Sequence, residues 1–217
     1  IYCDPPYKDT AEYRATNKFD HEKFWDIIRK WSKHNIVIVS EFKAPKDFHG
    51  KSLIYVQLWR TINTFLFKLS PDFIPGFRNY ILRLFGAKIG KGVTIKSSAK
   101  IHYPWKLKIG DHSWIGYNCD IYNVCELEIG SHVSIAHNVT ICCGSHDLQK
   151  KNFEIIKMKK IEIQDEAWIA NNVFIGPEVI IKKGAAIGAN SSTFKNLDEG
   201  ILYVGNPAKP IKKRHSS

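Results

Sequence analysis

Residues Cys142–Asp147, with the sequence CCGSHD, bring together side chains that can accept a proton or attack a carbonyl. At neutral pH, histidine is the side chain most readily able to take a proton from a hydroxyl group. We therefore take His146 as a candidate general base. Its neighbour Asp147 either orients the imidazole or stabilises the following loop, and the sequence leaves both roles open. Four other histidines are expected to be surface residues without a role: His49, His102, His112 and His215.

The two thiols before His146 offer an alternative chemistry. Cys142 or Cys143 could act as a nucleophile if a nearby group lowered its pKa. Both follow Ile141, however, at positions where small apolar residues would line a wall. The chain holds five cysteines, an odd number without the spacing of a metal site, so we expect reduced thiols and no metal.

A second motif, Asp4-Pro5-Pro6-Tyr7, directly follows a short apolar run. Together with the segments DHEKFWDIIRKWSKH and NIVIVSEF, it resembles the C-terminal part of Dam-type adenine-specific DNA methyltransferases over residues 1–48. The resemblance implies a strand, a helix and a second strand. It also implies that Asp4 and a proline carbonyl accept hydrogen bonds from the adenine amino group, while Tyr7 stacks on the flipped base.

Other features of this segment argue against methyltransferase activity. Residues 1–50 hold nine Lys and Arg against eight Asp and Glu, so they lack the basic surface that DNA phosphates require. No Gly-rich turn for S-adenosylmethionine accompanies the motif. A single strand–helix–strand unit also buries too little apolar surface to be stable alone. We expect residues 1–48 to be a non-functional fragment, fused near residues 42–50, and we expect no nucleic-acid partner.

The larger part of the chain shows a six-residue repeat of isoleucine. The triplet Ile89, Ile95 and Ile101 recurs from Ile109 and again from Ile129, which gives a longer period of 20 residues. After an interruption, the repeat resumes at Ile163 and continues to Ile187. Neither a helix nor an alternating strand has this period. A triangular coil does, with isoleucine pointing inward and glycine at the turns. Stacked coils of this kind predict a mainly β protein, a parallel β-helix.

The stretches RLFGAKIGKGVTI, YPWKLKIGD, GSHD and GNPAKPIKKR carry a second resemblance. Residues 45–214 resemble the left-handed β-helix hexapeptide-repeat O-acetyltransferases of the colanic acid, maltose and nodulation type. This resemblance implies left-handed coils, acetyl-CoA as co-substrate, a homotrimer and a small-molecule sugar or polysaccharide precursor as acceptor. It implies that His146 removes the proton from a sugar hydroxyl, which then attacks the thioester while backbone N–H groups stabilise the oxyanion.

The same resemblance assigns the binding residues. It places Asn118, Asp120 and Asn123 at the acceptor site, although Gly116 stands where the maltose-type enzymes often have Asn. We expect Lys213 and Arg214 to form a solvated tail. Seven residues would contact coenzyme A: Trp168, Asn171 and Ala189 on the pantetheine arm, Phe194 and Lys195 near the adenine, and Lys209 and Lys212 on the phosphates.

Two amphipathic helices, over residues 55–67 and 75–90 with Gly86 as a stop, are predicted to cover the open end of the coils. An alternative is that this apolar segment contacts a membrane surface. Residues 51–217 carry a net charge of about +10, which suits a phosphate-bearing cofactor. We expect a fragment over residues 1–48, a helical cap over 49–88 and the β-helix over 89–217. Reduced thiols and the lack of a signal peptide predict a cytoplasmic enzyme. A β-helix scaffold without catalysis is the remaining alternative.

Overall fold

The protein forms two compact units, residues 1–46 with 146–156 and residues 47–145 with 157–217. In the computed structural model, the described residues are 2–3, 21–33, 38–39, 48–71, 74–147, 149, 155–156 and 159–214.

The first unit contains the predicted strand–helix–strand segment. Strand β1 (Tyr2–Cys3) pairs in parallel with β2 (Ile38–Val39), and helix α2 (His21–Ser32) lies between them in the chain. The expected order of elements is therefore confirmed. The motif residues Asp4, Pro5, Pro6 and Tyr7 lie outside the described residues.

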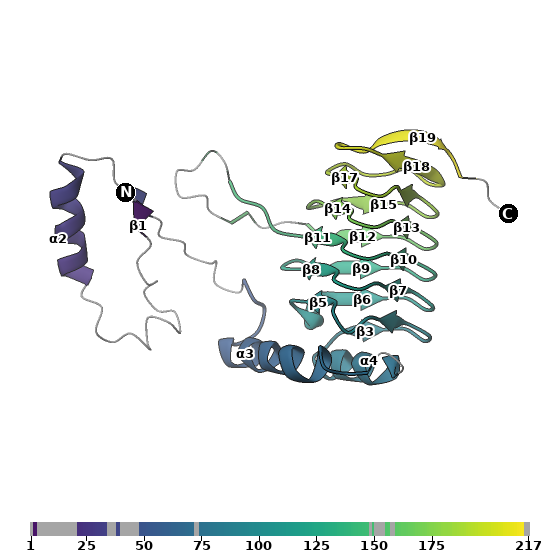
Figure 1. The fold of residues 1–217 in the computed structure, drawn as a ribbon, viewed down its shortest axis with the longest axis horizontal. Helices are drawn as coiled ribbons and strands as arrows, with labels where there is room; N and C mark the ends of the chain where they lie inside the picture. The colour runs from purple at the N-terminus through teal and green to yellow at the C-terminus, as the bar shows by residue number, and fades with distance from the viewer. Residues whose placement is uncertain are drawn as a thin grey trace. The chain divides into compact units, whose positions relative to one another are not determined.

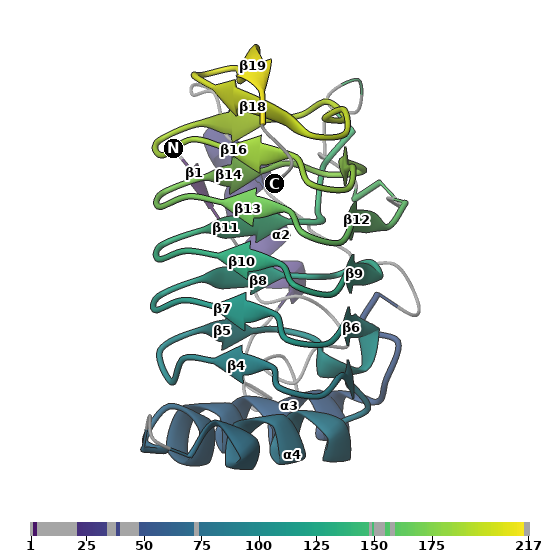
Figure 2. The ribbon, with the colours of Figure 1, turned by 90° about the vertical axis from the view of Figure 1, so that its right-hand side faces the viewer.

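The second unit is a column of triangular coils with three sheets, parallel throughout except for the last strand, β19 (Lys209–Lys213) (Figures 1 and 2). The first sheet contains β4 (Thr94–Ile95), β7 (Trp114–Ile115), β10 (Ser134–Ile135), β13 (Trp168–Ile169), β16 (Ala186–Ile187), β18 (Ile201–Val204) and β19 (Lys209–Lys213). The second contains β5 (Lys100–Ile101), β8 (Asp120–Tyr122), β11 (Thr140–Cys142), β14 (Phe174–Ile175) and β17 (Ser192–Thr193). The third contains β3 (Lys88–Ile89), β6 (Leu107–Ile109), β9 (Leu127–Ile129), β12 (Ile161–Ile163) and β15 (Ile180–Ile181), and a short 3-10 helix, η2 (Pro104–Lys106), precedes β6.

The repeated isoleucines fill the interior of this column, as the six-residue spacing predicts. Ile95, Ile115, Ile135 and Ile169 are fully buried and lie above one another in the first sheet. Stacking identical branched side chains in this way buries a continuous apolar core that each coil shares with its neighbours. The predicted parallel β-helix is confirmed.

The turns between the sheets explain the glycine after many of the isoleucines. A Cβ atom on Gly110 would lie 2.6 Å from backbone atoms of Gly130 and Ser131 in the next coil. The coils therefore approach too closely for a side chain at this corner. At other corners the chain takes a left-handed conformation without glycine, as at Asn118, with φ of 56°.

Helices cover the lower end of the column. Helix α3 (Leu53–Ile62) continues into a π-helical turn, η1 (Asn63–Phe67), and helix α4 (Pro75–Leu84) follows. Gly86, with φ of 90°, ends the helix as predicted. The predicted range of 75–90 nevertheless ran too far, because the chain is already in strand β3 at residue 88. No helix in the described part of the chain is both long enough and apolar enough to cross a bilayer.

The cap also satisfies the open edge of the first coil. Its side chains donate hydrogen bonds to one strand carbonyl in each sheet: Arg83 Nη2 to Ile89 O at 2.9 Å, Arg78 Nε to Ile95 O at 2.6 Å and Trp59 Nε1 to Ile101 O at 2.8 Å. Buried carbonyls without a partner would destabilise this edge. The helices therefore replace the neighbouring coil that these strands lack, as the predicted cap requires.

Candidate active site

The coil that carries His146 is longer than those below it. Ile129 of β9 pairs with Ile163 of β12, although the two residues are 34 positions apart instead of 20. The chain leaves the column after β11 and rejoins it in register at β12. The predicted insertion loop is thus accommodated without disturbing the stack, which leaves its sequence free to serve binding or catalysis.

His146 begins the part of this loop that belongs to the first unit. It forms an antiparallel bridge with Ile155, so the two arms of the loop pair with each other. The carboxylate of Asp147 accepts a hydrogen bond from the backbone N–H of Gln149 at 2.9 Å. This contact is typical of a side chain that stabilises a turn. Of the two roles left open for Asp147, the structure supports the turn.

The thiols of the CCGSHD segment have different environments. Cys143 is fully buried, and both its hydrogen bond with Cys125 and its burial raise the pKa of its thiol. A raised pKa keeps the thiol protonated and therefore unreactive. The Sγ atom of the half-buried Cys142 lies 3.5 Å from Gly144 O. Cys143 consequently serves the core, and the nucleophile alternative loses one of its two candidates.

The outer face of the second sheet holds a polar cluster that the sequence analysis did not predict. His102 Nε2 lies 3.0 Å from Asp120 Oδ1, and the His102 ring meets the edge of Tyr122, with centroids 5.2 Å apart. Burial raises the pKa of Tyr122. His102, expected to be a surface residue without a role, is thus held by fixed neighbours. The signal was present in the sequence, because residues about 20 apart become neighbours in successive coils.

Two of the predicted pantetheine residues share one corner of the column. Asn171 and Ala189 precede corner residues Asn172 and Asn190, and the Asn190 N–H donates to Asn171 O at 3.0 Å. Trp168 lies on β13, where its side chain is 45% exposed. An indole left this accessible provides apolar surface beside the corner for a ligand chain. The Asn171 side chain already accepts a hydrogen bond from the His137 N–H at 3.0 Å, so its remaining donors are the groups open to a ligand.

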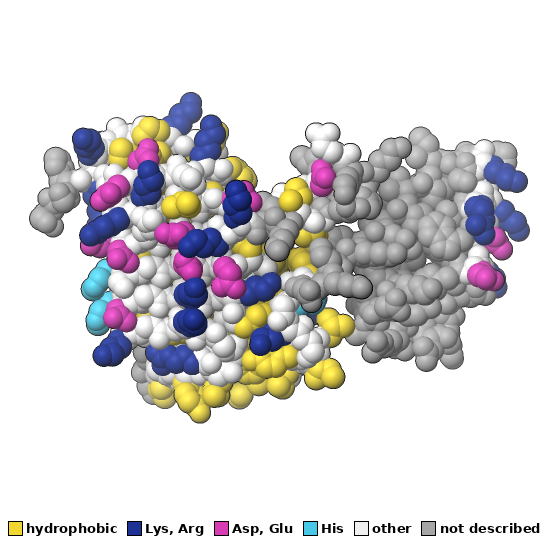
Figure 3. Space-filling model, turned by 180° about the vertical axis from the view of Figure 1, so that it is seen from behind, with side chains coloured by type: hydrophobic (Ala, Val, Ile, Leu, Met, Phe, Trp, Pro, Cys, Tyr) yellow, Lys and Arg dark blue, Asp and Glu magenta, His cyan; other side chains and the backbone are white. Residues whose placement is uncertain are grey.

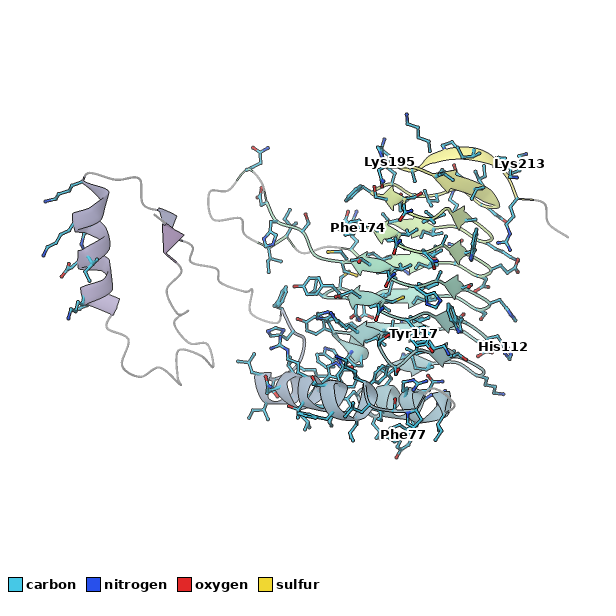
Figure 4. All side chains as sticks on the ribbon, in the orientation of Figure 1. Phe77, His112, Tyr117, Phe174, Lys195 and Lys213 are labelled. Atoms are coloured by element: carbon cyan, nitrogen blue, oxygen red, sulfur yellow. The ribbon has the colours of Figure 1, made fainter. Side chains whose placement is uncertain are left out.

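The predicted adenine contacts lie at the next corner. The Phe194 ring is 61% exposed and packs on Phe174 with centroids 5.5 Å apart. A Cβ atom on Gly176 would come within 2.5 Å of the Phe194 ring, so this glycine makes room for the aromatic pair. Lys195 follows directly and is exposed; Figure 4 shows it on the same side of the column as Phe174.

The C-terminal hairpin separates the two predicted phosphate contacts. Ala208, the residue before Lys209, donates its N–H to Ser192 O at 2.8 Å, which holds Lys209 beside β17. Lys212 pairs with Leu202 further along β19, roughly 10 Å away at about 3.3 Å per residue. Both side chains are exposed. Lys209 therefore lies nearer the corner residues than Lys212 does.

Arg214 differs from the expected solvated tail. Its guanidinium donates to Glu166 O at 2.8 Å and Gly184 O at 3.3 Å, and its backbone N–H bonds to Gly200 O. The residue fastens the end of the hairpin to the coils below. No repeat marks this segment in the sequence, so the antiparallel return of β19 was not predicted.

The two asparagines that the resemblance assigns to the acceptor site differ in burial. Asn118 is exposed at a corner, and its backbone N–H donates to Ser98 Oγ at 2.9 Å. Asn123 is fully buried, and its amide exchanges two hydrogen bonds with the Tyr103 backbone, at 2.7 and 3.0 Å. These bonds give Asn123 a structural role. At Gly116, a Cβ atom would lie 2.7 Å from the Ala136 backbone, so this coil has no space for the asparagine of the maltose-type enzymes.

Comparisons with known proteins place the chain among acetyltransferases. No model of a protein family matches it. It is 43% identical over 176 residues to WcaF of Escherichia coli, a protein named for an acetyltransferase role in colanic acid biosynthesis; the match covers 81% of this chain and 96% of that protein. A maltose O-acetyltransferase structure from Clostridium difficile 630 superposes with a TM-score of 0.67 and 29% identity, over 76% of this chain and 90% of that one.

A third structure shows the same fold with a ligand. A hexapeptide-repeat acetyltransferase of Vibrio cholerae O1 biovar eltor, in complex with acetyl coenzyme A, matches with a TM-score of 0.66 over 75% of this chain and 87% of that one. At 23% identity this likeness concerns the fold alone. The extensive match to WcaF, with the repeat and the coils described above, shows that the chain belongs to the hexapeptide-repeat acetyltransferases, which have the left-handed parallel β-helix fold.

Proposed function

We propose that this protein is an acetyl-CoA-dependent O-acetyltransferase that acts on a hydroxyl group of a sugar or polysaccharide precursor, with His146 as general base. The observation that carries the proposal is the position of His146. In a chain of an acetyltransferase family, it begins the loop that breaks an otherwise regular column. The relatives named for colanic acid and maltose support a carbohydrate acceptor.

In the proposed reaction, an imidazole nitrogen of His146 accepts the proton of the acceptor hydroxyl as its oxygen attacks the thioester carbonyl. Backbone N–H groups stabilise the negative charge on the tetrahedral intermediate. The intermediate collapses by breaking the carbon–sulfur bond, and the imidazolium returns the proton to the leaving coenzyme A thiolate. The ester and free coenzyme A are the products. Asp147, through its bond to Gln149, stabilises the turn that follows the base.

For the cofactor, we propose that Trp168, Asn171 and Ala189 line the pantetheine arm. Phe194 and Lys195 contact the adenine end, and Lys209 and Lys212 contact the phosphates, with Lys209 nearer the corner. Lys195, Lys209 and Lys212 are exposed and pair with no carboxylate among the described residues, which suits contact with phosphate groups. A homotrimer with the sites between subunits, and a cytoplasmic location, belong to the same proposal.

The outer face of the second sheet supplies a competing base. His102, held by Asp120 at 3.0 Å, has the geometry of an imidazole oriented by a carboxylate. This pair lies on the coils below β11, near Tyr122. We assign it to the acceptor side, together with Asn118, and keep His146 as the base.

An acetyl-transfer assay over a panel of sugars and nucleotide sugars, read as coenzyme A release, tests the proposal. The His146→Ala variant should lower kcat/KM by on the order of 100- to 10,000-fold, the usual contribution of a general base. His102→Ala is the matched control and should raise KM with a much smaller change in kcat. The reverse pattern would move the base to His102. Absence of coenzyme A release with every acceptor would favour the scaffold alternative.

The methyltransferase-like segment is proposed to be an inactive fragment, with domains at residues 1–48, 49–88 and 89–217. Calorimetric titration of the full chain with S-adenosylmethionine should show no heat of binding. Binding in the micromolar range would revive the alternative in which Asp4, Pro5, Pro6 and Tyr7 form part of a working adenine site.

A further inference from the structure

The positive charge of the chain is concentrated at the capped end of the column. Residues 48–110 hold eleven Lys and Arg against one Asp, which accounts for most of the formal net charge of +11. Arg78 is buried in the cap. Five exposed cations form what we call the basic rim, and no carboxylate in the described part of the chain forms an ion pair with them: Lys51, Arg60, Lys68, Lys88 and Lys91.

The helices of the cap present apolar side chains to solvent. Ile54 is 83% exposed, Phe65 61% and Leu69 75%. A helix that only covered a column end would have a polar outer surface. Figure 3 shows hydrophobic side chains gathered at this lower end, and in Figure 4 Phe77 points away from the coils. The exposed apolar residues, here called the cap face, are Leu53, Ile54, Leu58, Phe65, Leu66, Leu69, Ile74, Phe77, Tyr80 and Leu84.

Helical periodicity puts several of these residues on one side of each helix. Ile54 and Leu58 are four apart on α3, opposite the buried Val56 and Trp59. Phe77, Tyr80 and Leu84 are spaced at three and four on α4, opposite the buried Leu82. Each helix is therefore apolar on two sides, one against the coils and one outward.

A shallow, open depression adjoins the rim. The side chains of Arg83, Lys88 and Lys108 border it, and Ala87, Ile89 and Ile109 give it a largely apolar surface. Lys108 is paired with Glu128, at 2.7 Å. The Arg83 guanidinium already donates to Ile89 O and Gly90 O. Lys88 forms no ion pair with a carboxylate of the described residues, so its charge is available to an external anion. A phosphate head group carries the matching charge.

We propose that the cap face and the basic rim dock on the surface of an anionic lipid bilayer, with α3 and α4 lying in the interface and not crossing it. Apolar side chains bordered by Lys and Arg are the pattern of interfacial helices, and anionic head groups attract the cations around them. A second copy is a poorer occupant, because an end-to-end dimer would bring two basic rims together. The inference goes beyond acetyl transfer and does not depend on it.

Sedimentation of the full chain with lipid vesicles tests the inference. The protein should bind vesicles of phosphatidylcholine with about 30% phosphatidylglycerol, and bind much less to phosphatidylcholine alone, because the anionic surface attracts the rim. Binding should weaken as salt rises from 0.05 to about 0.5 M. Failure to bind the anionic vesicles at low salt would overturn the proposal.

Matched variants separate the cap from general charge and hydrophobicity. Phe65→Ser with Phe77→Ser should abolish most vesicle binding, while Val204→Ser with Ile211→Ser, exposed apolar residues at the other end, should not. Each basic residue near an anionic surface contributes about fivefold in affinity, so three rim substitutions should weaken binding by on the order of 100-fold. The rim substitutions are Lys51→Gln, Lys68→Gln and Lys88→Gln, with Lys182→Gln, Lys183→Gln and Lys213→Gln as the control of equal charge.

The controls also distinguish a lipid bilayer from a second copy of the chain as the partner of the cap face. Thermal unfolding should show that the cap variants remain folded, because the replaced side chains are exposed. Equal loss of binding in cap and control variants would refute a specific docking face. If the Phe65 and Phe77 substitutions instead reduced the mass of the oligomer in solution, the face would belong to a second copy and the proposal would be wrong.

Discussion

Glu128 lies on the outer side of the third sheet between two lysines. Its carboxylate contacts Lys108 Nζ at 2.7 Å and Lys160 Nζ at 2.6 Å. These hydrogen bonds lower the pKa of Glu128 to about 2. A carboxylate with a lowered pKa stabilises the folded state above its unfolded pKa, and this contribution is lost as the pH falls toward the folded value.

We therefore predict a pH-dependent effect of Glu128→Gln. At pH 7 the variant should unfold more easily, by no more than about 1 kcal/mol, because the group and both lysines are partly exposed and screened. The difference should shrink as the pH falls from about 4.5 to 2. Urea unfolding at several pH values measures it. A difference in unfolding free energy that stayed constant down to pH 2, or that did not change in about 0.5 M salt, would contradict this account.

Individual site residues were predictable where the repeat determines their neighbours. Asn123 and Tyr103, His112 and His132, and Lys108 and Glu128 are each 20 residues apart and in contact. A period of 20 predicts such pairs from the sequence alone. We assigned Asn123 to the acceptor because of the resemblance, whereas its register position makes it a bridge between coils. The partner of a side chain in a solenoid follows from the period more reliably than from its own chemistry.

At the scale of elements, the column was predictable and its ends were not. An inward isoleucine every six residues leaves few alternatives, since each coil repeats the same burial. The helices of the cap were recognised from their apolar periodicity. Their hydrogen bonds to the first coil were not predicted, because Arg78 and Trp59 belong to no repeat. The carbonyls that accept these bonds lie 17 and 42 residues further along the chain.

The buried Arg78 allows a direct test of how the cap works. It is fully buried and donates to Ile95 O at 2.6 Å, Ser70 Oγ at 2.9 Å and Pro71 O at 2.9 Å. Arg78→Met keeps the aliphatic length and leaves these acceptors without their donor. We expect it to lower the free energy of unfolding by about 2–4 kcal/mol.

Urea denaturation measures this loss. Arg83→Met is the control, because Arg83 makes similar bonds to Ile89 and Gly90 from an exposed position where water can replace it. Its loss of stability should be much smaller. If the two variants lost the same stability, burial would not explain the importance of Arg78.

At the scale of the whole molecule, the two units differ in how they are held together. Residues 47–145 and 157–217 share one continuous core. Within the described residues of the first unit, the sheet has two strands of two residues each. A chain with one extensive core and one small sheet should place nearly all its stability in the former.

Removing residues 1–44 should therefore leave the column folded and acetyl transfer intact. The unfolding midpoint should change by no more than a few degrees, since a loss of 1 kcal/mol corresponds to about 2–4 °C at this size. Circular dichroism during heating and the coenzyme A release assay measure both quantities. Loss of activity in a folded truncated protein would show that the N-terminal segment contributes to the site.

The cap and the C-terminal hairpin together make the number of coils finite. Stacked parallel coils expose hydrogen-bonding groups at both ends and could in principle add further chains one after another, as amyloid filaments do. At the lower end, side chains of α3 and α4 occupy the carbonyls. At the upper end, β19 runs antiparallel to β18 and Arg214 fastens it to the coils. End-to-end stacking of columns through these covered edges is thereby disfavoured.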